Sequence, residues 1–344
     1  MERFSESAKL HSPLMDFEMD IQDIEIRKDP LTGNMSIIGL RLVDKLETLI
    51  ESTDDEFLNA FVNENSEKCF FCPEKVHTAT PKFPEEILPE GRITVGESVL
   101  FPNLFPLSKY HAIIVLSKKH FLKPQEFAPS MLRDAFLAAR EFVSHLPPDE
   151  NLFGSLNCNY MPPAGASAVH AHLQLIASSQ PTNYSRKTQD ALLEYSEKYG
   201  HEYWDDLIEL EKELGVRYVG QLESTHWFTP FSPTCTNEVF GLLPSGKFKD
   251  TPDEVITSLA QGVSNVLEYY GNDGYSSFNF SLELGDLTDQ EKSNRCFIRL
   301  ATRQNFTRGY RAGEFFFQHL LNTEVVVIPP EIVASKLRGS FVGA

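Results

Sequence analysis

The sequence predicts an α+β protein built from two copies of one unit, each an antiparallel sheet with a packed helix. Runs such as RITVGESVLFPN and HAIIVLS have the β-branched and aromatic composition of strands. Between some of these runs, apolar residues recur every three or four positions, as they do in amphipathic helices. The same order of runs returns about 125 residues later, which indicates an internal duplication.

In the first copy, one helix is predicted to begin near Ser130 and to end before Pro147. Its apolar stripe consists of Leu132, Phe136, Ala139, Val143 and Leu146. Two strands follow, NLFGSLNCNY and VHAHLQLIAS, and residues 185–214 are predicted to be helical. Ahead of all these elements, residues 1–26 are predicted to form an irregular arm. RKDPLTGN then predicts a turn, and SIIGLRLV predicts a strand.

The second copy matches the first in pattern more than in identity. Residues 106–117 correspond to residues 233–244, which lie 127 positions later. The run FIRLATR, which begins at Phe297, mirrors HLQLIAS at an offset of 125. We therefore predict a first unit over residues 1–184, which carries the functional site, and a second, degenerate unit over residues 185–344.

The composition limits the kinds of partner. The 344 residues include 49 acidic and 31 basic ones, for a formal net charge of −18. Such a surface repels phosphate backbones and anionic lipids, so neither nucleic acid nor membrane partners are expected. The N-terminal residues lack the apolar segment of a signal peptide, which predicts a cytoplasmic protein. The five cysteines do not suggest a disulfide framework, and Cys158, Cys235 and Cys296 are predicted to be core thiols.

The strand VHAHLQLIAS carries an unusual polar row. Because successive side chains in a strand point to opposite faces, His170, His172 and Gln174 share one face. The row is either a buried polar ladder or a working site. The second copy has Arg295 and Phe297 at the positions of the two histidines and Arg299 at the position of Gln174. Since one copy discards all three groups, the strand does not need them, which favours a function.

CFFCP contains a Cys-x-x-Cys, formed by Cys69 and Cys72. Half of a zinc site, a redox pair and coincidence all remain open on spacing alone. The preceding NENSEK does not resemble the strand that a thioredoxin-type redox pair follows. Zinc needs two further ligands, for which His170 and His120 are candidates and His111 is the runner-up.

A second group of residues is suited to phosphate. Gly165 lets the backbone approach a ligand closely, Ser167 and Gln174 supply neutral hydrogen-bond donors, and Asn159 lies in the same turn and strand region. Neutral His172 can attack phosphorus if its other ring nitrogen is held by a carbonyl. A general-base role for His172 is the alternative chemistry.

These motifs resemble those of one family. RKDPLTG, CFFCP, FPNLFP, SKKH and NYMPPAGASAVHAHLQ occur in the order and approximate spacing typical of the galactose-1-phosphate uridylyltransferase branch of the histidine-triad superfamily. The resemblance spans about residues 25–180, and the two-copy plan extends it to most of the chain. It implies two fused histidine-triad-like repeats, nucleotidylation of His172, and usually a homodimer.

The resemblance also implies roles for the other site residues. Gln174 and Ser167 would assist catalysis and hold the phosphates, with Gly165 and Asn159 beside them. The remaining assignments are Asn103 and Phe105 in the nucleoside pocket, Arg27 near the active site, and structural zinc on Cys69, Cys72, His120 and His170.

Several positions depart from the uridylyltransferase pattern. Ala171 replaces the proline between the histidines, and HAHLQ is similar to the H-x-H-L-Q of dinucleoside polyphosphate phosphorylases. Leu104 stands where an acidic residue often lies near the ribose. RCFIR replaces second-copy histidines that bind another metal in some members, so no second metal is expected. Glu314 is a loose candidate for a sugar contact.

The predicted activity is nucleotidyl transfer through a nucleotidyl-histidine. The nucleotide would move from a nucleoside diphosphate sugar or dinucleotide to phosphate or a sugar 1-phosphate. Phosphorolysis or hydrolysis of nucleotide sugars or dinucleoside polyphosphates is the alternative with the same residues. A catalytically silent, zinc-stabilised nucleotide-binding protein is the alternative of another class. The sequence does not specify the base, the sugar or the acceptor.

Overall fold

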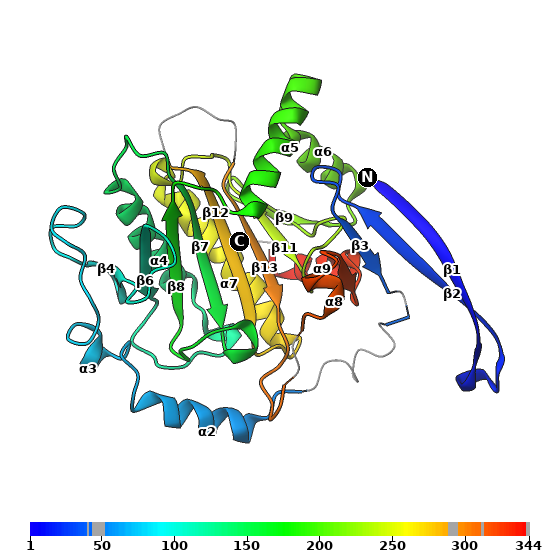
Figure 1. The fold of residues 1–344 in the computed structure, drawn as a ribbon, viewed down its shortest axis with the longest axis horizontal. Helices are drawn as coiled ribbons and strands as arrows, with labels where there is room; N and C mark the ends of the chain where they lie inside the picture. The colour runs from blue at the N-terminus through cyan, green and yellow to red at the C-terminus, as the bar shows by residue number, and fades with distance from the viewer. Residues whose placement is uncertain (40, 43–51, 288–294, 311–312, 342–344) are drawn as a thin grey trace.

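A ten-stranded antiparallel sheet runs through the computed structural model, which describes residues 1–344 except 40, 43–51, 288–294, 311–312 and 342–344 (Figure 1). From one edge to the other, its strands are β4 (Ile93–Val95), β5 (Ser98–Pro102), β6 (Tyr110–Val115), β8 (His172–Ser178), β7 (Phe153–Tyr160), β12 (Phe278–Asp286), β13 (Phe297–Thr302), β11 (Val239–Leu242), β10 (Thr225–Phe228) and β9 (Tyr218–Leu222). The predicted α+β class with antiparallel sheets is confirmed.

The strand order is the same in both halves of the sheet when each is followed from its own edge. It reads β4-β5-β6-β8-β7 in one half and β9-β10-β11-β13-β12 in the other, and the halves meet where β7 pairs with β12. The pairing registers also correspond, because Ile113 faces Gln174 in the first half and Phe240 faces Arg299 in the second. These pairs match the sequence offsets of 127 and 125, which supports a duplication. The division between residues 184 and 185 stays a prediction.

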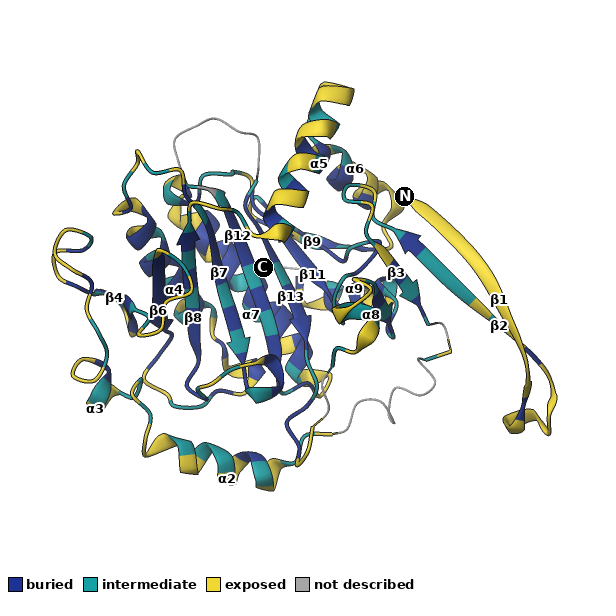
Figure 2. Ribbon diagram, in the orientation of Figure 1, coloured by how far each residue is buried: buried dark blue, intermediate teal, exposed yellow. Residues whose placement is uncertain are grey.

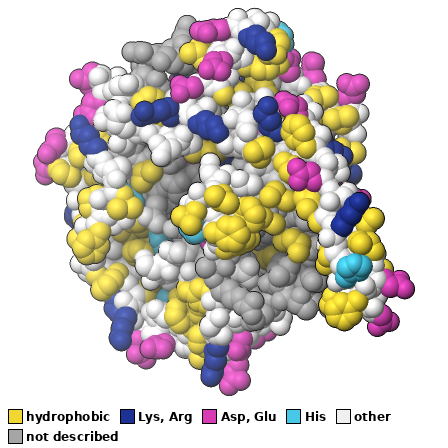
Figure 3. Space-filling view, turned by 45° about the vertical axis from the view of Figure 1, so that its right-hand side comes forward, with side chains coloured by type: hydrophobic (Ala, Val, Ile, Leu, Met, Phe, Trp, Pro, Cys, Tyr) yellow, Lys and Arg dark blue, Asp and Glu magenta, His cyan; other side chains and the backbone are white. Residues whose placement is uncertain are grey.

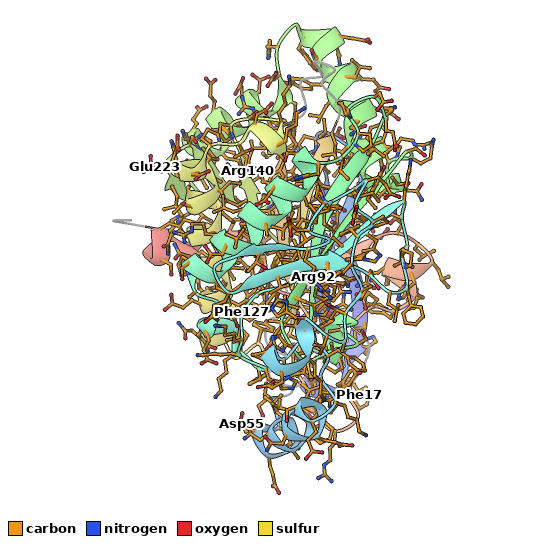
Figure 4. The ribbon with its side chains drawn as sticks, turned by 90° about the vertical axis from the view of Figure 1, so that its left-hand side faces the viewer. Phe17, Asp55, Arg92, Phe127, Arg140 and Glu223 are labelled. Carbon is orange, nitrogen blue, oxygen red and sulfur yellow. The ribbon has the colours of Figure 1, made fainter. Side chains whose placement is uncertain are left out.

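Helices α4 (Pro129–Ser144) and α7 (Asp253–Asn272) pack against each other on one face of the sheet. The predicted stripe of α4 is buried in the main hydrophobic core. Arg140 of α4 donates a hydrogen bond of 2.6 Å to Asp253 at the start of α7; Figure 4 labels this arginine on its helix. Residues of β8 that alternate with the polar row, such as Leu173 and Leu175, point into this core.

The opposite face of the sheet is covered differently in its two halves. Over the second half lie α5 (Asn183–Tyr199) and α6 (Tyr203–Leu214), which form a second apolar cluster with β10, β11 and β13. The predicted helical segment is thus two helices, because Gly200 ends α5 in the left-handed conformation at φ 80°. Over the first half, Phe71 packs in a small cluster with residues of β5 and β6. Figure 2 shows the buried strands between these layers.

The N-terminal segment is regular, so the prediction of an irregular arm is wrong. Strands β1 (Glu2–Ser12) and β2 (Glu18–Lys28) form a hairpin that projects from the body of the protein (Figure 1). The sheet continues through β3 (Met35–Ile38) to β14 (Glu324–Val326). The apolar residues of β1 and β2 lie largely on the surface. These strands therefore lack the alternation of apolar and polar residues by which a strand with one buried face is usually recognised. The predicted strand SIIGLRLV includes residues 40 and 43, which lie outside the described residues.

Among the described residues, the remaining α-helices are α2 (Asp55–Ser66), α3 (Pro73–Val76), α8 (Phe316–His319) and α9 (Pro330–Leu337). Cys158 and Cys296 are core thiols as predicted, whereas Cys235 is only half-buried. None of the helices in the described parts of the chain has the length and apolar character needed to cross a lipid bilayer. The cytoplasmic location stays a prediction.

Candidate functional site

Four residues from separate segments gather beside the start of β8. Cys69 follows α2, Cys72 precedes α3, His120 follows β6 and His170 lies two residues before β8. Their ligand atoms all lie within 4.8 Å of one another, so the four could hold a metal ion. Sγ of Cys72 lies 3.5 Å from Nδ1 of His120 and 3.7 Å from Nδ1 of His170. Sγ of Cys69 lies 3.6 Å from the same nitrogen of His170.

His170 is held in one orientation and one tautomer. Its side chain is fully buried, and its Nε2–H donates a hydrogen bond of 2.8 Å to the carbonyl oxygen of Ser117. The proton on Nε2 leaves the lone pair of Nδ1 directed toward the two sulfur atoms. Burial lowers the pKa of His170 to about 4, which keeps the imidazole neutral, as a metal ligand must be.

His172 has the opposite tautomer to His170. Its Nδ1–H donates a hydrogen bond of 2.9 Å to the carbonyl oxygen of His170, so the lone pair is on Nε2. Burial lowers the pKa of His172 as well, which favours the neutral ring. The ring of Phe71, from the Cys-x-x-Cys segment, packs against the His172 ring at 5.1 Å between centroids. His172 thus has the orientation that a nitrogen nucleophile or a general base requires.

Gln174 is oriented by His111, a role that the sequence analysis missed. The backbone N–H of Leu107 donates to Nδ1 of His111 at 3.0 Å, which leaves the proton of that ring on Nε2. Nε2 lies 3.1 Å from Oε1 of Gln174, so it donates to the amide oxygen and frees the NH₂ group as a donor. His111 was the runner-up metal ligand, and the structure places it on Gln174 instead. The available signal was the pairing of β6 with β8, in which His111 faces Ile176 and is therefore the diagonal neighbour of Gln174 on the same face of the sheet.

Asn159 and Gly165 lie close to each other. A Cβ atom at Gly165, whose φ is +83°, would lie 4.0 Å from Nδ2 of Asn159. Asn279 of β12 donates to Oδ1 of Asn159 at 2.8 Å and to the carbonyl oxygen of Ala164 at 3.0 Å. Asn279 therefore directs the NH₂ group of Asn159 away from itself and ties the glycine turn to the second half of the chain. A role for Asn279 was not predicted from the sequence.

The other predicted residues are placed less tightly. Ser167 is exposed and lines a hollow of about 490 Å³ with Cys69 and His120. Nδ2 of Asn103 lies 3.2 Å from Nε2 of His111, which brings this residue to Gln174. Phe105 is 79% exposed, and its place in a nucleoside pocket stays a prediction.

The contacts that the structure gives for Arg27 are with residues outside the candidate site. Its buried guanidinium pairs with Glu25 at 2.5 Å and with Glu331 at 2.8 Å, and it donates to the carbonyl oxygen of Phe231. These contacts connect β2 to the second half of the chain. A role for Arg27 near the active site stays a prediction.

The second half carries an ion pair at the equivalent positions. Glu238, just before β11, and Arg299 of β13 correspond to His111 and Gln174 by the same offsets, and they form an ion pair at 2.5 Å. The guanidinium of Arg299 also lies over the ring of Tyr184, 4.3 Å from its centroid. The second copy has thus exchanged a neutral amide for a paired charge.

The ten-stranded sheet and its packed helices have the fold of solved GalT-like proteins and uridylyltransferases. A GalT-like protein and an ADP-glucose phosphorylase with bound ADP-glucose, both from Arabidopsis thaliana, each superpose with a TM-score of 0.67 at 16% identity. These alignments cover 91% and 92% of this chain and 98% of each of the other two chains. A uridylyltransferase superposes with a TM-score of 0.65 at 16% identity, over 92% of this chain and 98% of the other.

No protein-family model matches the chain. The chain belongs to one family with an uncharacterised protein of Archaeoglobus fulgidus, to which it is 31% identical over 317 residues. The aligned region covers 92% of both proteins.

Proposed function

We propose that this protein is a nucleotidyltransferase in which His172 carries the nucleotide between two substrates. The observation that carries the proposal is the hydrogen bond from Nδ1 of His172 to the carbonyl oxygen of His170, which leaves the lone pair of the ring on Nε2. The neighbouring amides of Gln174 and Asn159 supply hydrogen-bond donors, and they are not nucleophiles that would compete with His172 for the phosphorus. The fold shared with an ADP-glucose phosphorylase and a uridylyltransferase supports the same class of reaction.

The reaction proceeds in two displacements. Nε2 of His172 forms a bond to the α-phosphorus of a nucleoside diphosphate sugar. The bond from that phosphorus to the bridging oxygen breaks, and the electron pair leaves with the sugar 1-phosphate. An oxygen of phosphate or of another sugar 1-phosphate then attacks the same phosphorus and releases His172. A donor placed at the developing negative charge contributes on the order of 3 kcal/mol to each barrier.

We further propose that Cys69, Cys72, His120 and His170 hold a structural zinc ion. Zn–S bonds of about 2.3 Å and Zn–N bonds of about 2.05 Å in a tetrahedron imply S···N edges of about 3.5 Å. The three S···N separations of 3.5 to 3.7 Å fit this value. Four protein ligands leave no open position, so zinc would fix the segment that carries Phe71 against the strand that carries His172.

A homodimer is the third part of the proposal. Strand β1 is an exposed edge strand of 11 residues, which can pair with another chain. Large apolar side chains around the hairpin turn are exposed, among them Leu14 at 85% and Phe17 at 68%. Figure 4 labels Phe17, and Figure 3 shows apolar side chains on the projecting hairpin. Exposed apolar groups on a projecting arm favour association. Sedimentation should therefore give a dimer for the wild type and a monomer for the double variant Leu14→Ser, Phe17→Ser. A monomeric wild type would contradict this part.

The chemistry is tested by intact-protein mass spectrometry. Wild type and His172→Ala are mixed separately with UDP-glucose, ADP-glucose, GDP-glucose and diadenosine tetraphosphate. We expect one nucleoside monophosphate adduct on the wild type and none on the variant, and the added mass identifies the base. Faster loss of the adduct with sugar 1-phosphate, with phosphate or in water then identifies the acceptor. Turnover that survives in His172→Ala would exclude the covalent route.

A further inference from the structure

A second pocket lies over the second half of the sheet, on the face that carries the first site in the other half. It is a partly open hollow of about 600 Å³, its mouth included, between α5, α6, the strands β10, β11 and β13, and the turn that follows β2. Its walls include the aromatic rings of Tyr184, Tyr203, Trp204, Phe228, Phe231 and Phe240.

Three polar atoms of side chains that line this pocket have no hydrogen-bond partner among the described residues. They are Oγ1 of Thr188, Nε1 of Trp204 and Oε2 of Glu211. All three side chains are deeply buried, with 4%, 3% and 1% of their residue surfaces exposed. Buried polar groups in native proteins almost always have partners, so three unpaired atoms around one pocket indicate a ligand that supplies them.

The unpaired atoms define what that ligand offers. The indole N–H of Trp204 needs an acceptor, the carboxylate oxygen of Glu211 needs a donor, and the hydroxyl of Thr188 accepts either. Flat aromatic walls suit a planar ring. A ring with both acceptor and donor groups on its edge meets all these requirements.

The charges of the pocket exclude phosphate. Arg299 is paired with Glu238 at 2.5 Å. Glu211 is paired with Arg217 at 2.9 Å. Asp29, also in the lining, adds a further carboxylate and accepts hydrogen bonds from Thr32. A phosphate here would meet carboxylates, and the guanidinium in the lining is already engaged. This is the opposite of the first site, where neutral amides and imidazoles line the strand.

We propose that this pocket binds a planar heteroaromatic compound without phosphate, of the nucleobase or nucleoside type. The degenerate copy has lost the histidines and amide of the first copy, and its pocket includes Glu238 and Arg299, which correspond to His111 and Gln174. The inference does not depend on the nucleotidyl-transfer reaction, because none of its residues belongs to the first site.

The two tryptophans of the chain make a selective test possible. Trp204 lines the pocket, whereas Trp227 is fully buried in the main core and serves as an internal control. The full-length protein is labelled with 5-fluorotryptophan, and Trp204→Phe assigns the two ¹⁹F resonances. Adenine, adenosine, guanosine and uridine are titrated separately, with AMP as the phosphorylated counterpart of adenosine. At least one uncharged compound should shift the Trp204 resonance in a saturable way while the Trp227 resonance stays in place.

A matched pair of variants ties the signal to the pocket. Thr188→Val keeps the shape of the side chain but removes the hydroxyl, and it should weaken binding about fivefold. Thr257→Val, at an exposed threonine of α7, should leave the affinity unchanged. If none of the compounds moves the Trp204 resonance, if Thr188→Val binds as tightly as Thr257→Val, or if AMP binds as well as adenosine, the proposal is wrong.

Discussion

Asn279, in the second half of the chain, donates a hydrogen bond of 2.8 Å to Asn159 in the first half. The two residues face each other where β7 and β12 join the halves of the sheet. The second copy, although it has lost the row of histidines, therefore still positions a residue of the site in the first. Its amide also holds the carbonyl oxygen of Ala164 in the turn before Gly165.

Asn279→Ala should lower kcat about tenfold, because loss of one hydrogen bond of this kind costs about 1 to 1.5 kcal/mol of positioning. KM for the nucleotide donor should change less than kcat, and metal content should stay at the wild-type value. Steady-state kinetics and metal analysis check these outcomes. Asn151→Ala, in the exposed turn before β7, is the control and should behave as wild type. Equal activity in both variants would show that Asn159 does not need its partner.

His170→Ala should release the metal and lower the free energy of unfolding by about 3 kcal/mol, since loss of a structural metal is among the most damaging changes. Removal of this ring also leaves the carbonyl oxygen of Ser117 without its donor. Elemental analysis and thermal unfolding measure the two effects. His172→Ala, two residues along the same segment, is the matched control and should keep its metal. Full metal content in His170→Ala would show that another group completes the site.

Much of the fold could be predicted because its signals are periodic. The apolar stripe of α4 and the alternation of apolar and polar residues in β8 arise because each element buries one face. The sequence offsets of 127 and 125 between the two copies reappear in the pairing of the strands. The hairpin of β1 and β2 could not be found in this way, because its apolar side chains are mostly exposed. Nor could the break at Gly200, since the charged and apolar residues are mixed on both sides of it.

For a similar reason, the sequence predicted the candidate metal ligands but not the residues that orient the site. The residue types and the spacing of Cys69, Cys72 and His170 indicate metal ligands, and the structure brings these residues together with His120. The residues that orient the site act across strands, so sequence distance hides them. His111 lies 63 residues from its partner Gln174, and Asn279 lies 120 residues from Asn159.

His111→Ala should lower kcat by a factor of about 10 to 100, because Gln174 then loses the donor that fixes its amide. The reactive state of His172 is untouched, so the nucleotidyl adduct should still form, but more slowly. Rapid-quench measurement of adduct formation checks this. His145→Ala removes an exposed histidine just beyond the end of α4 and provides the control. If His111→Ala instead loses metal, then His111 supports the cysteines after all.

Glu324→Gln should make the protein more stable at alkaline pH. Burial raises the pKa of Glu324 in β14 to about 7, with Glu238 adding to the rise and the hydrogen bond from Gln318 opposing it. Because the folded state holds this proton more tightly than the unfolded state does, stability falls as pH rises from about 4.5 to 7 and stays lower above. The loss is up to about 3 kcal/mol.

The glutamine variant lacks this titration, so its free energy of unfolding should equal that of the wild type near pH 4.5 and exceed it at pH 8. Urea unfolding at both pH values measures the difference. Glu64→Gln, at an exposed position of α2, should follow the wild type at each pH. A Glu324→Gln curve parallel to that of the wild type would show that this carboxylate is ionised without cost in the folded protein.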